Sequence, residues 1–267
     1  METKKIFITL MLLISSSLYS QQTVLRKYMV VRSPAKYTLQ LNFSYNLPLL
    51  ELYGTSNADF NSPKVLSGET FGGSKGFGAS VISKICLSKC GKLRFTQLLS
   101  FNRVQSYLLQ DKSDLMDRGN ALYNLYSAGL GFEYNFTPAY KVKAYSGFDF
   151  DLNMINGEIR IWEYKNKQSI TEDYKVLNSF RVGVGINAGA GYMISEKVGL
   201  NFEIRFVNAN LLLKSATGTN NDREFQLRDS GSSEELKFSG NKNFTFYSLS
   251  LGLNFYFGVG HKSYKIK

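Results

Sequence analysis

Hydrophobic and polar residues alternate strictly near the end of the chain. In FTFYSLSLGLNFYF, residues 244–257, every odd position from Leu249 to Phe257 is apolar, and the even positions between them are polar or small. A period of two is that of a β-strand, whose successive side chains point to opposite faces. This segment is therefore predicted to be a strand with one apolar face and one polar face.

Segments of the same kind recur about eight times along the chain. They are expected at residues 36–46, 72–88, 93–109, 121–136, 142–164, 176–194, 198–215 and 244–257. The connections 47–71, 110–120, 165–175 and 216–242 are long, and they alternate with the tight turns 89–92, 137–141 and 195–197. Such alternation is typical of an outer-membrane barrel with short periplasmic turns and long external loops.

The predicted fold is therefore all-β, a transmembrane antiparallel up-and-down barrel that is apolar towards lipid and polar towards its lumen. Parity alone does not exclude a soluble barrel with the apolar face inside. Residues 24–32 could add one strand, and a bulge is expected near residues 207–209. The far end of segment 142–164, through Trp162, is expected to project beyond the membrane.

The start of the chain has the composition of a signal peptide. Lys4 and Lys5 precede the apolar residues 6–14, and small and polar residues follow up to Ser20. We expect residues 1–20 to be a signal peptide, 21–35 a periplasmic N-terminal segment, 36–257 the barrel and 258–267 a basic periplasmic tail. The expected location is the outer membrane, reached through the inner membrane with the help of this signal peptide.

Aromatic residues are abundant, with 20 Phe and 17 Tyr against a single Trp. This excess is typical of aromatic girdles at the two membrane interfaces. The residues expected at the short-turn end are Tyr134, Phe136, Tyr140, Tyr192, Phe255 and Phe257. Those expected at the long-loop end are Tyr107, Tyr123, Trp162, Tyr164, Phe180 and Phe244.

The net charge of +11 does not indicate nucleic-acid binding, because Lys and Arg are scattered and form no basic helix or stripe. Outer-membrane lipid and lipopolysaccharide are the expected counterparts of this charge.

The leader, the amphipathic strands and the closing segment YSLSLGLNFYF, residues 247–257, resemble the outer-membrane protein β-barrel domain family of Gram-negative bacteria. The plan is similar to that of the small eight-stranded outer-membrane barrels. The resemblance implies insertion by the outer-membrane assembly machinery, which often recognises a terminal aromatic residue. Here Phe255 and Phe257 are followed by a ten-residue tail, so the recognition signal would be internal.

Charged residues gather on the face predicted to line the lumen: Lys84, Arg94, Glu133, Lys143, Asp149, Asp151, Arg181, Glu203 and Arg205. An eight-stranded barrel is just wide enough for side chains to fill, and buried charges must pair or be hydrated. The favoured interpretation is a network of opposite charges that plugs the lumen. The alternatives are an ion-selective pore or a proton relay, and a carboxylate pair of Asp149 and Asp151 for acid–base chemistry.

Glycines 183, 185, 189 and 191 share the lumen face of segment 176–194. Their spacing does not match the dinucleotide-binding fingerprint, and no helix follows. We expect them to make room for long side chains from the facing strands.

Cys86 and Cys90 flank the first tight turn, and this spacing allows a disulfide if their Cα atoms lie within about 7 Å. The pair lacks the spacing of a zinc or redox motif, so no metal site is expected. His261 is the only histidine and lies in the tail, where no Ser–His–Asp site can form. We therefore expect no catalytic residues and no cofactor.

These patterns favour a non-enzymatic outer-membrane barrel with a largely plugged polar lumen. It would be structural, or would bind a protein partner through the external loops 47–71 and 216–242. The alternative is a narrow, porin-like channel, or an accessory barrel of a secretion or surface-assembly system.

Overall fold

The computed structural model describes residues 28–54, 70–109, 118–165, 168–214, 219–221, 223–230 and 241–265. The expected signal peptide, residues 1–20, lies outside these ranges, as do large parts of the four expected loops. In the described part of the chain no helix is long and apolar enough to cross a membrane.

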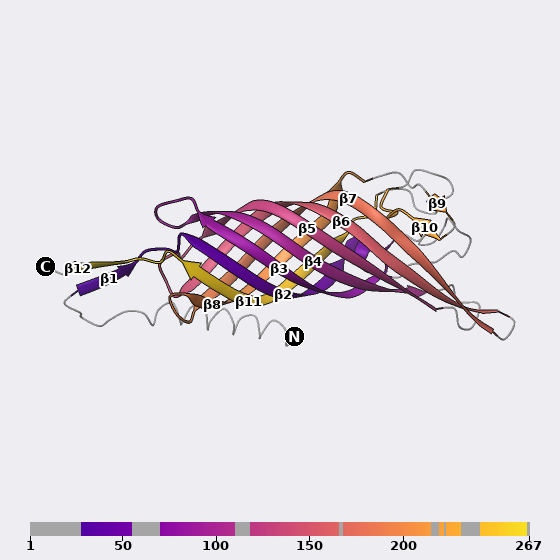
Figure 1. Cartoon of the computed structure of the whole chain (residues 1–267), viewed down its shortest axis with the longest axis horizontal. Coiled ribbons are helices and arrows are strands. Elements are labelled where there is room, and N and C mark those ends of the chain that lie inside the picture. The colour runs from indigo at the N-terminus through magenta and orange to yellow at the C-terminus, as the bar shows by residue number, and fades with distance from the viewer. Residues whose placement is uncertain are drawn as a thin grey trace, which may run out of the picture.

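Eight long strands form one closed antiparallel barrel (Figure 1). In chain order they are β2 (Tyr37–Leu49), β3 (Gly73–Cys86), β4 (Leu93–Leu109), β5 (Arg118–Asn135), β6 (Val142–Lys165), β7 (Gln168–Met193), β8 (Val198–Leu212) and β11 (Thr245–Phe257). Each strand pairs with the next, and β11 closes the barrel by pairing with both β8 and β2. The predicted up-and-down barrel of eight strands is confirmed.

The two faces of the barrel wall differ in polarity as the membrane interpretation requires. Phe43 on β2 is 77% exposed and Leu251 on β11 is 67% exposed on the outer face, whereas Gln40 and Asn254 are buried inside. A soluble barrel would carry its apolar residues inside, so this burial settles the question that parity left open. An apolar outer face of this extent is stable only against lipid.

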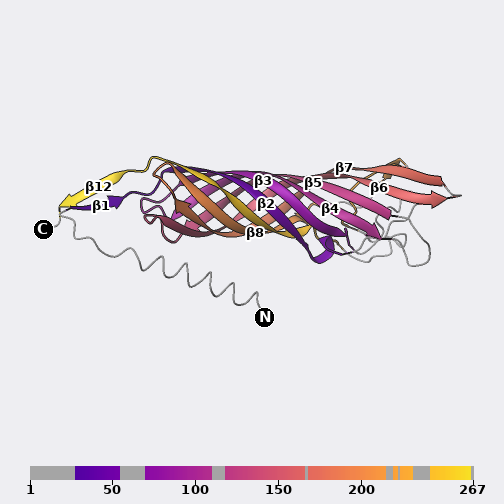
Figure 2. The same ribbon diagram turned by 90° about the horizontal axis from the view of Figure 1, so that it is seen from below.

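Most strand ends lie within a few residues of the bounds expected from the sequence. The connection expected at 165–175, however, is not a long loop. Lys165 pairs with Gln168, so β7 begins eight residues earlier than expected, at Gln168 instead of position 176. Strands β6 and β7 form a long hairpin that extends beyond the other strands (Figures 1 and 2). The projection expected for Trp162 is therefore present, as paired strand.

A register shift on β8 lies next to the expected bulge. Val182 of β7 pairs with Leu212, and Val184 pairs with Asn208, so β8 uses more residues than β7 at this point. The remaining short elements are η1 (Leu50–Leu52), β9 (Thr219–Asn221) and β10 (Glu224–Phe225) at the long-loop end. Strand β10 adds to the edge of β7 in parallel, through the pairs Glu224–Lys175 and Phe225–Val176.

The two ends of the chain meet outside the barrel. Strand β1 (Tyr28–Arg32) pairs antiparallel with β12 (His261–Lys265). Of the segment 24–32 and the expected basic tail 258–267, the described residues 28–32 and 261–265 therefore form a separate two-stranded ribbon and add no barrel strand. This ribbon projects from the short-turn end, opposite β9 and β10 (Figures 1 and 2).

Candidate functional site

All nine charged residues expected in the lumen lie inside the barrel, and none is more than 7% exposed. They are Lys84, Arg94, Glu133, Lys143, Asp149, Asp151, Arg181, Glu203 and Arg205. The structure divides them into separate clusters instead of one continuous network.

The first cluster lies on β3, β4 and β5 and joins two cations to one carboxylate. Lys84 Nζ donates to Glu133 Oε2, and Arg94 Nη1 lies 3.6 Å from Glu133 Oε1. Arg94 and Glu133 are directly opposite each other in the ladder, so the strand register itself brings them together. Lys84 Nζ also lies 4.0 Å above the ring of Tyr145, a cation–π contact that occupies its other side.

The second cluster places Arg205 of β8 against two carboxylates of β6. Arg205 Nη2 donates to Asp149 Oδ1 and to Asp151 Oδ2, the latter at 2.6 Å. The glycine of β7 at position 185 makes this possible, because a Cβ there would lie 2.6 Å from Arg205 Nε and from Asp149 Oδ1. The expectation that glycines of this strand make room for long side chains is confirmed at Gly185.

Glu203 forms a third group, held by uncharged donors. Gln40 Nε2 donates to Glu203 Oε2 over 3.1 Å, and the Tyr145 hydroxyl donates to the same oxygen over 2.9 Å. A cavity of about 20 Å³ lies beside Glu203 and Arg205, lined also by Ser80 and Ser250. This is room for one water molecule.

Lys143 and Arg181 contact groups outside these three clusters. Lys143 Nζ donates to the carbonyl of Pro138 in the second tight turn. Arg181 pairs instead with Asp229, through Nε–Oδ2 at 2.7 Å and Nη2–Oδ1 at 2.9 Å.

Asp229 belongs to residues 223–230, an external segment that folds back into the mouth of the barrel and that we call the folded-back segment. Its side chain also accepts from Asn210 Nδ2 at 2.9 Å, and its carbonyl accepts from Lys242 N at 2.9 Å. Asn210 Oδ1 in turn accepts from Phe244 N at 2.6 Å. Residues 227–229 and Lys242, expected in an exposed polar loop, are thus buried, which corrects that part of the expected partner-binding loop 216–242.

At the long-loop end, which we call the upper end, the lumen is filled by a hydrophobic cluster that we call the cap. Its aromatic centre is a triangle of Phe71, Tyr123 and Phe244, whose ring centroids lie 5.6 to 5.8 Å apart. Leu52 of η1 and Leu227 of the folded-back segment pack with them, and all five side chains are at most 1% exposed. Phe71 and Leu52 come from the expected external loop 47–71, so both long loops contribute to closing the barrel.

The cap was not predicted from the sequence, although strand β6 carries a pattern that indicates it. The inward positions of β6 change from Asp149 and Asp151 to Ile155 and Ile159, all of them buried. The outward positions change in the opposite sense, to polar residues such as Glu158. The strand keeps its facing while its polarity inverts, as expected where it leaves lipid and enters water.

Lys242 is buried within this cap. Its side chain is 2% exposed, and its Nζ lies 4.6 Å from the ring centroid of Phe71. Burial and, to a smaller extent, the nearby Arg228 lower the pKa of the Lys242 ammonium to about 7, although Asp229 opposes the shift.

The aromatic residues expected in the girdles are exposed or half-buried at the short-turn end, but only some of them are exposed at the other end. Tyr134, Phe136, Tyr140, Tyr192 and Phe257 are exposed on the outer face, and Phe255 is half-buried. Trp162 and Phe180 are also exposed, but Tyr123 and Phe244 are core residues of the cap. The side chains of Tyr107 and Tyr164 lie outside the described residues.

Cys86 and Cys90 are free thiols in the structure, in contrast to the disulfide that their spacing allows. Cys86 Sγ donates to the Ser88 carbonyl, and Cys90 Sγ contacts the Ser88 hydroxyl. The hydrogen bond with Ser88 lowers the pKa of the Cys90 thiol, which is exposed at the turn. Within the described ranges, no group of three or more His, Cys, Asp or Glu residues could hold a metal ion.

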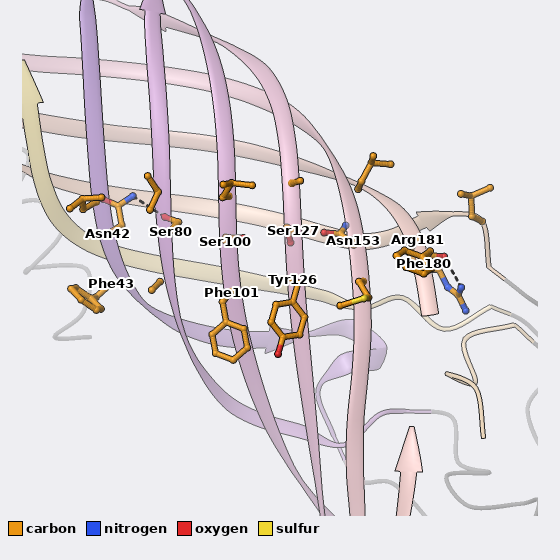
Figure 3. A pocket seen from close by; sticks show the side chains of 18 residues that line it. Asn42, Phe43, Ser80, Ser100, Phe101, Tyr126, Ser127, Asn153, Phe180 and Arg181 are labelled. Carbon is orange, nitrogen blue, oxygen red and sulfur yellow. Dashed lines mark hydrogen bonds between the residues drawn. The ribbon is translucent and has the colours of Figure 1, made fainter. Parts of the chain in front are cut away.

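A shallow groove of about 820 Å³ crosses the outer face of the barrel from β2 to β7 (Figure 3). Phe43, Phe101, Tyr126 and Phe180 are among its lining residues, and Ala79 and Ala128 leave it hollow. These residues belong to the apolar outer band, so the groove has the character of the lipid-facing surface of a barrel.

No family model matches the sequence, and no curated protein matches it. Among solved structures, Neisserial surface protein A is 16% identical, over 84% of this chain and 98% of that one, with a TM-score of 0.45. The attachment invasion locus protein Ail of Yersinia pestis is 8% identical, over 84% and 99%, with a TM-score of 0.39. The outer membrane protease OmpT of Escherichia coli is 10% identical, over 86% and 96%, with a TM-score of 0.38.

These likenesses carry no argument about the function of this chain. The closed barrel of eight antiparallel strands is itself the architecture of the small outer-membrane barrels. The resemblance expected from the sequence is therefore confirmed for the fold.

Proposed function

We propose that this chain is a non-enzymatic outer-membrane barrel whose lumen is closed to ions. It serves as a structural element of the membrane or binds a partner at its external end, the end of the long loops. The observation that carries the proposal is the filling of the lumen, by charged clusters in its lower part and by the hydrophobic cap above them.

The charges of the lower lumen balance. Four cations (Lys84, Arg94, Lys143 and Arg205) are buried with four carboxylates (Glu133, Asp149, Asp151 and Glu203). An ion-selective pore needs charges of one sign that face water, whereas most of these face each other or fixed dipoles. The balanced arrangement supports a plug.

A narrow channel is the alternative, and unsatisfied polar atoms are the observation in its favour. Arg94 Nε and Nη2 and Arg205 Nε are buried without a partner among the described residues. Such atoms require water, so the lower lumen is expected to hold isolated water molecules. A conducting path would also have to pass the cap, where Phe71, Tyr123 and Phe244 are in contact.

An enzymatic role has less support. One of the similar structures is named a protease, which concerns that protein alone. In this chain the only histidine, His261, lies in β12 at the end opposite the external mouth. A Ser–His–Asp site at the external end therefore has no histidine available.

The apolar outer band and the expected signal peptide support a location in the outer membrane. Lipid and lipopolysaccharide would surround the band, after insertion by the outer-membrane assembly machinery. An accessory role in a secretion or surface-assembly system is compatible with a closed lumen, because the external end remains available to a partner.

Single-channel recording in a planar bilayer tests the closed lumen. The protein is first shown to be folded by its shifted mobility on unheated gels, and heat-denatured protein is the matched control. We expect no conductance steps above those of the control. Stable, ion-selective steps that change in Arg205→Ala would overturn the proposal and establish the channel.

A further inference from the structure

A row of three amides marks the upper edge of the apolar band on β5, β6 and β7. Asn124 Nδ2 donates to Asn156 Oδ1 at 3.2 Å, and Asn156 Nδ2 donates to Asn178 Oδ1 at 2.8 Å. The next outward residues towards the short-turn end are the apolar Tyr126, Met154 and Phe180. Polar side chains are excluded from hydrocarbon, so the wall above this row faces water.

Above the row, the outer face of β6 and β7 carries charges of alternating sign. Glu158 lies opposite Lys175 in the ladder, and Arg160 lies opposite Asp173. Arg160 Nε is 2.6 Å from Asp173 Oδ1. Each charge therefore has an opposite charge as its neighbour both along its strand and across to the next one.

Strand β10 continues the same alternation on the far side of β7. Glu224 pairs with Lys175 in parallel register, and their charged atoms are 3.8 Å apart. Arg223, whose carbonyl accepts from Lys175 N at 2.8 Å, precedes it. The folded-back segment that helps to form the cap inside thus also forms one side of a charged outer surface.

These residues surround a hollow of about 480 Å³ with an apolar contribution from Leu122 and Trp162. Trp162 is the only tryptophan of the chain and is 37% exposed. A concave site with an aromatic surface and a few convergent polar groups is the usual form of a small-ligand site.

The charges of this hollow indicate an uncharged ligand. Three cations, Arg160, Lys175 and Arg223, are matched by three carboxylates, Glu158, Asp173 and Glu224. A polyanion or a polycation would meet as many like charges as opposite ones, whereas hydroxyl groups can donate to the carboxylates and accept from the cations.

We propose that this hollow binds a neutral saccharide, with a pyranose ring against Trp162 and its hydroxyls on the paired charges. The axial C–H bonds of a pyranose give the ring an apolar face with weakly positive hydrogens, which suits the electron-rich face of an indole. The inference rests on the proposed function, because it assigns the external end a ligand. The sugar could belong to lipopolysaccharide of the same membrane or to a soluble glycan.

Trp162 supplies the measurement, because all tryptophan fluorescence of the chain arises from this residue. The folded full-length protein in phospholipid nanodiscs is titrated with soluble oligosaccharides of glucose and of N-acetylglucosamine. In a second arm, the nanodiscs contain lipopolysaccharide. We expect a saturable change in Trp162 emission and protection of Trp162 from acrylamide quenching in one of the two arms.

Two variants test the polar half of the site. Asp173→Ala and Arg160→Ala each remove one partner of the exposed pair and should weaken binding at least about tenfold, since hydrogen bonds to charged groups contribute that much. Lys89→Ala, an exposed residue in the first tight turn at the opposite end, is the matched control and should bind normally.

An effect of soluble oligosaccharide identifies a soluble glycan, and an effect confined to lipopolysaccharide discs identifies the sugars of the same membrane. Absence of a saturable change in both arms would overturn the inference. The proposed function is tested separately: a silent bilayer with no saccharide binding removes only this inference, whereas channel activity removes the proposed function whatever Trp162 reports.

Discussion

Arg181 of β7 and Asp229 of the folded-back segment form a buried, two-point ion pair, with Nε–Oδ2 at 2.7 Å and Nη2–Oδ1 at 2.9 Å. The side chains are 3% and 0% exposed. This pair connects the barrel wall to the segment that supplies Leu227 to the cap. Its geometry is that of a planar guanidinium on a carboxylate, which is the strongest form of ion pair in proteins.

Replacing Arg181 with Ala is expected to release the folded-back segment. The change leaves the Asp229 carboxylate buried without its guanidinium, which costs about 3–5 kcal/mol unless the segment moves into water. We expect trypsin to cleave at Arg223 or Arg228 in Arg181→Ala while the barrel keeps its folded mobility on unheated gels. Cleavage rates are compared with the wild type by mass spectrometry.

Arg160→Ala is the matched control for Arg181→Ala. This variant likewise removes an arginine–aspartate pair, here between Arg160 of β6 and Asp173 of β7. The pair is exposed, with side-chain exposures of 54% and 65%. Exposed pairs contribute little to stability, so this variant should resist trypsin at the folded-back segment like the wild type. Equal resistance of all three proteins would show that the pair does not hold the segment.

The strands were predictable because period-two alternation directly reports the two faces of a barrel wall. The lumen position of Arg94 and Glu133 follows from the same parity, and their pairing follows from the register between adjacent strands. The partner of Arg181 could not be predicted in this way. Asp229 is 48 residues away in a connection without periodicity, and no strand register relates the two.

The cap was missed for a different reason. Above the amide row, inward apolar residues such as Ile159 alternate with outward polar residues. The period of two is unchanged, but the apolar face is now the inner one. The facing of the odd positions continues along the whole strand, but the rule that inward residues are polar holds only up to Asn153. Locating the inversion at Ile155 would have predicted both the membrane edge and the apolar upper lumen.

Removal of Arg205 is expected to destabilise the barrel strongly, because of the charge that is lost and not because of the volume. Arg205→Ala leaves Asp149 and Asp151 facing each other and should lower the free energy of unfolding by about 3–5 kcal/mol. Adding Asp149→Asn and Asp151→Asn removes the uncompensated charge and should restore most of the loss. Urea unfolding in lipid vesicles, followed by gel mobility, measures both. A triple variant no more stable than Arg205→Ala would instead point to lost packing.

The thiols of Cys86 and Cys90, at the first tight turn, are expected to react at different rates. Cys90 is exposed and its pKa is lowered by the hydrogen bond with Ser88, whereas Cys86 is half-buried. Since the thiolate is the reactive form, maleimide should label Cys90 before Cys86, and Ser88→Ala should slow the labelling of Cys90. Peptide mass spectrometry identifies the labelled residue. Protein that takes up no label until it is reduced would instead contain the Cys86–Cys90 disulfide.

Because Lys242 is buried, we expect the stability of the cap to rise with pH. Its pKa is about 7 when folded, because of burial, against an ordinary 10.5, so between these values the unfolded chain binds more protons than the folded one. The free energy of unfolding therefore increases from about pH 7 to about pH 10.5, and the cost of burying the charge is fully present below pH 7. Lys242→Met keeps a long side chain beside Phe71 and removes the charge, so it should be more stable than the wild type at pH 6 and should lose this slope. Lys92→Met, in the exposed first turn, should keep the slope, and an unchanged slope in Lys242→Met would mean that another group titrates in the cap.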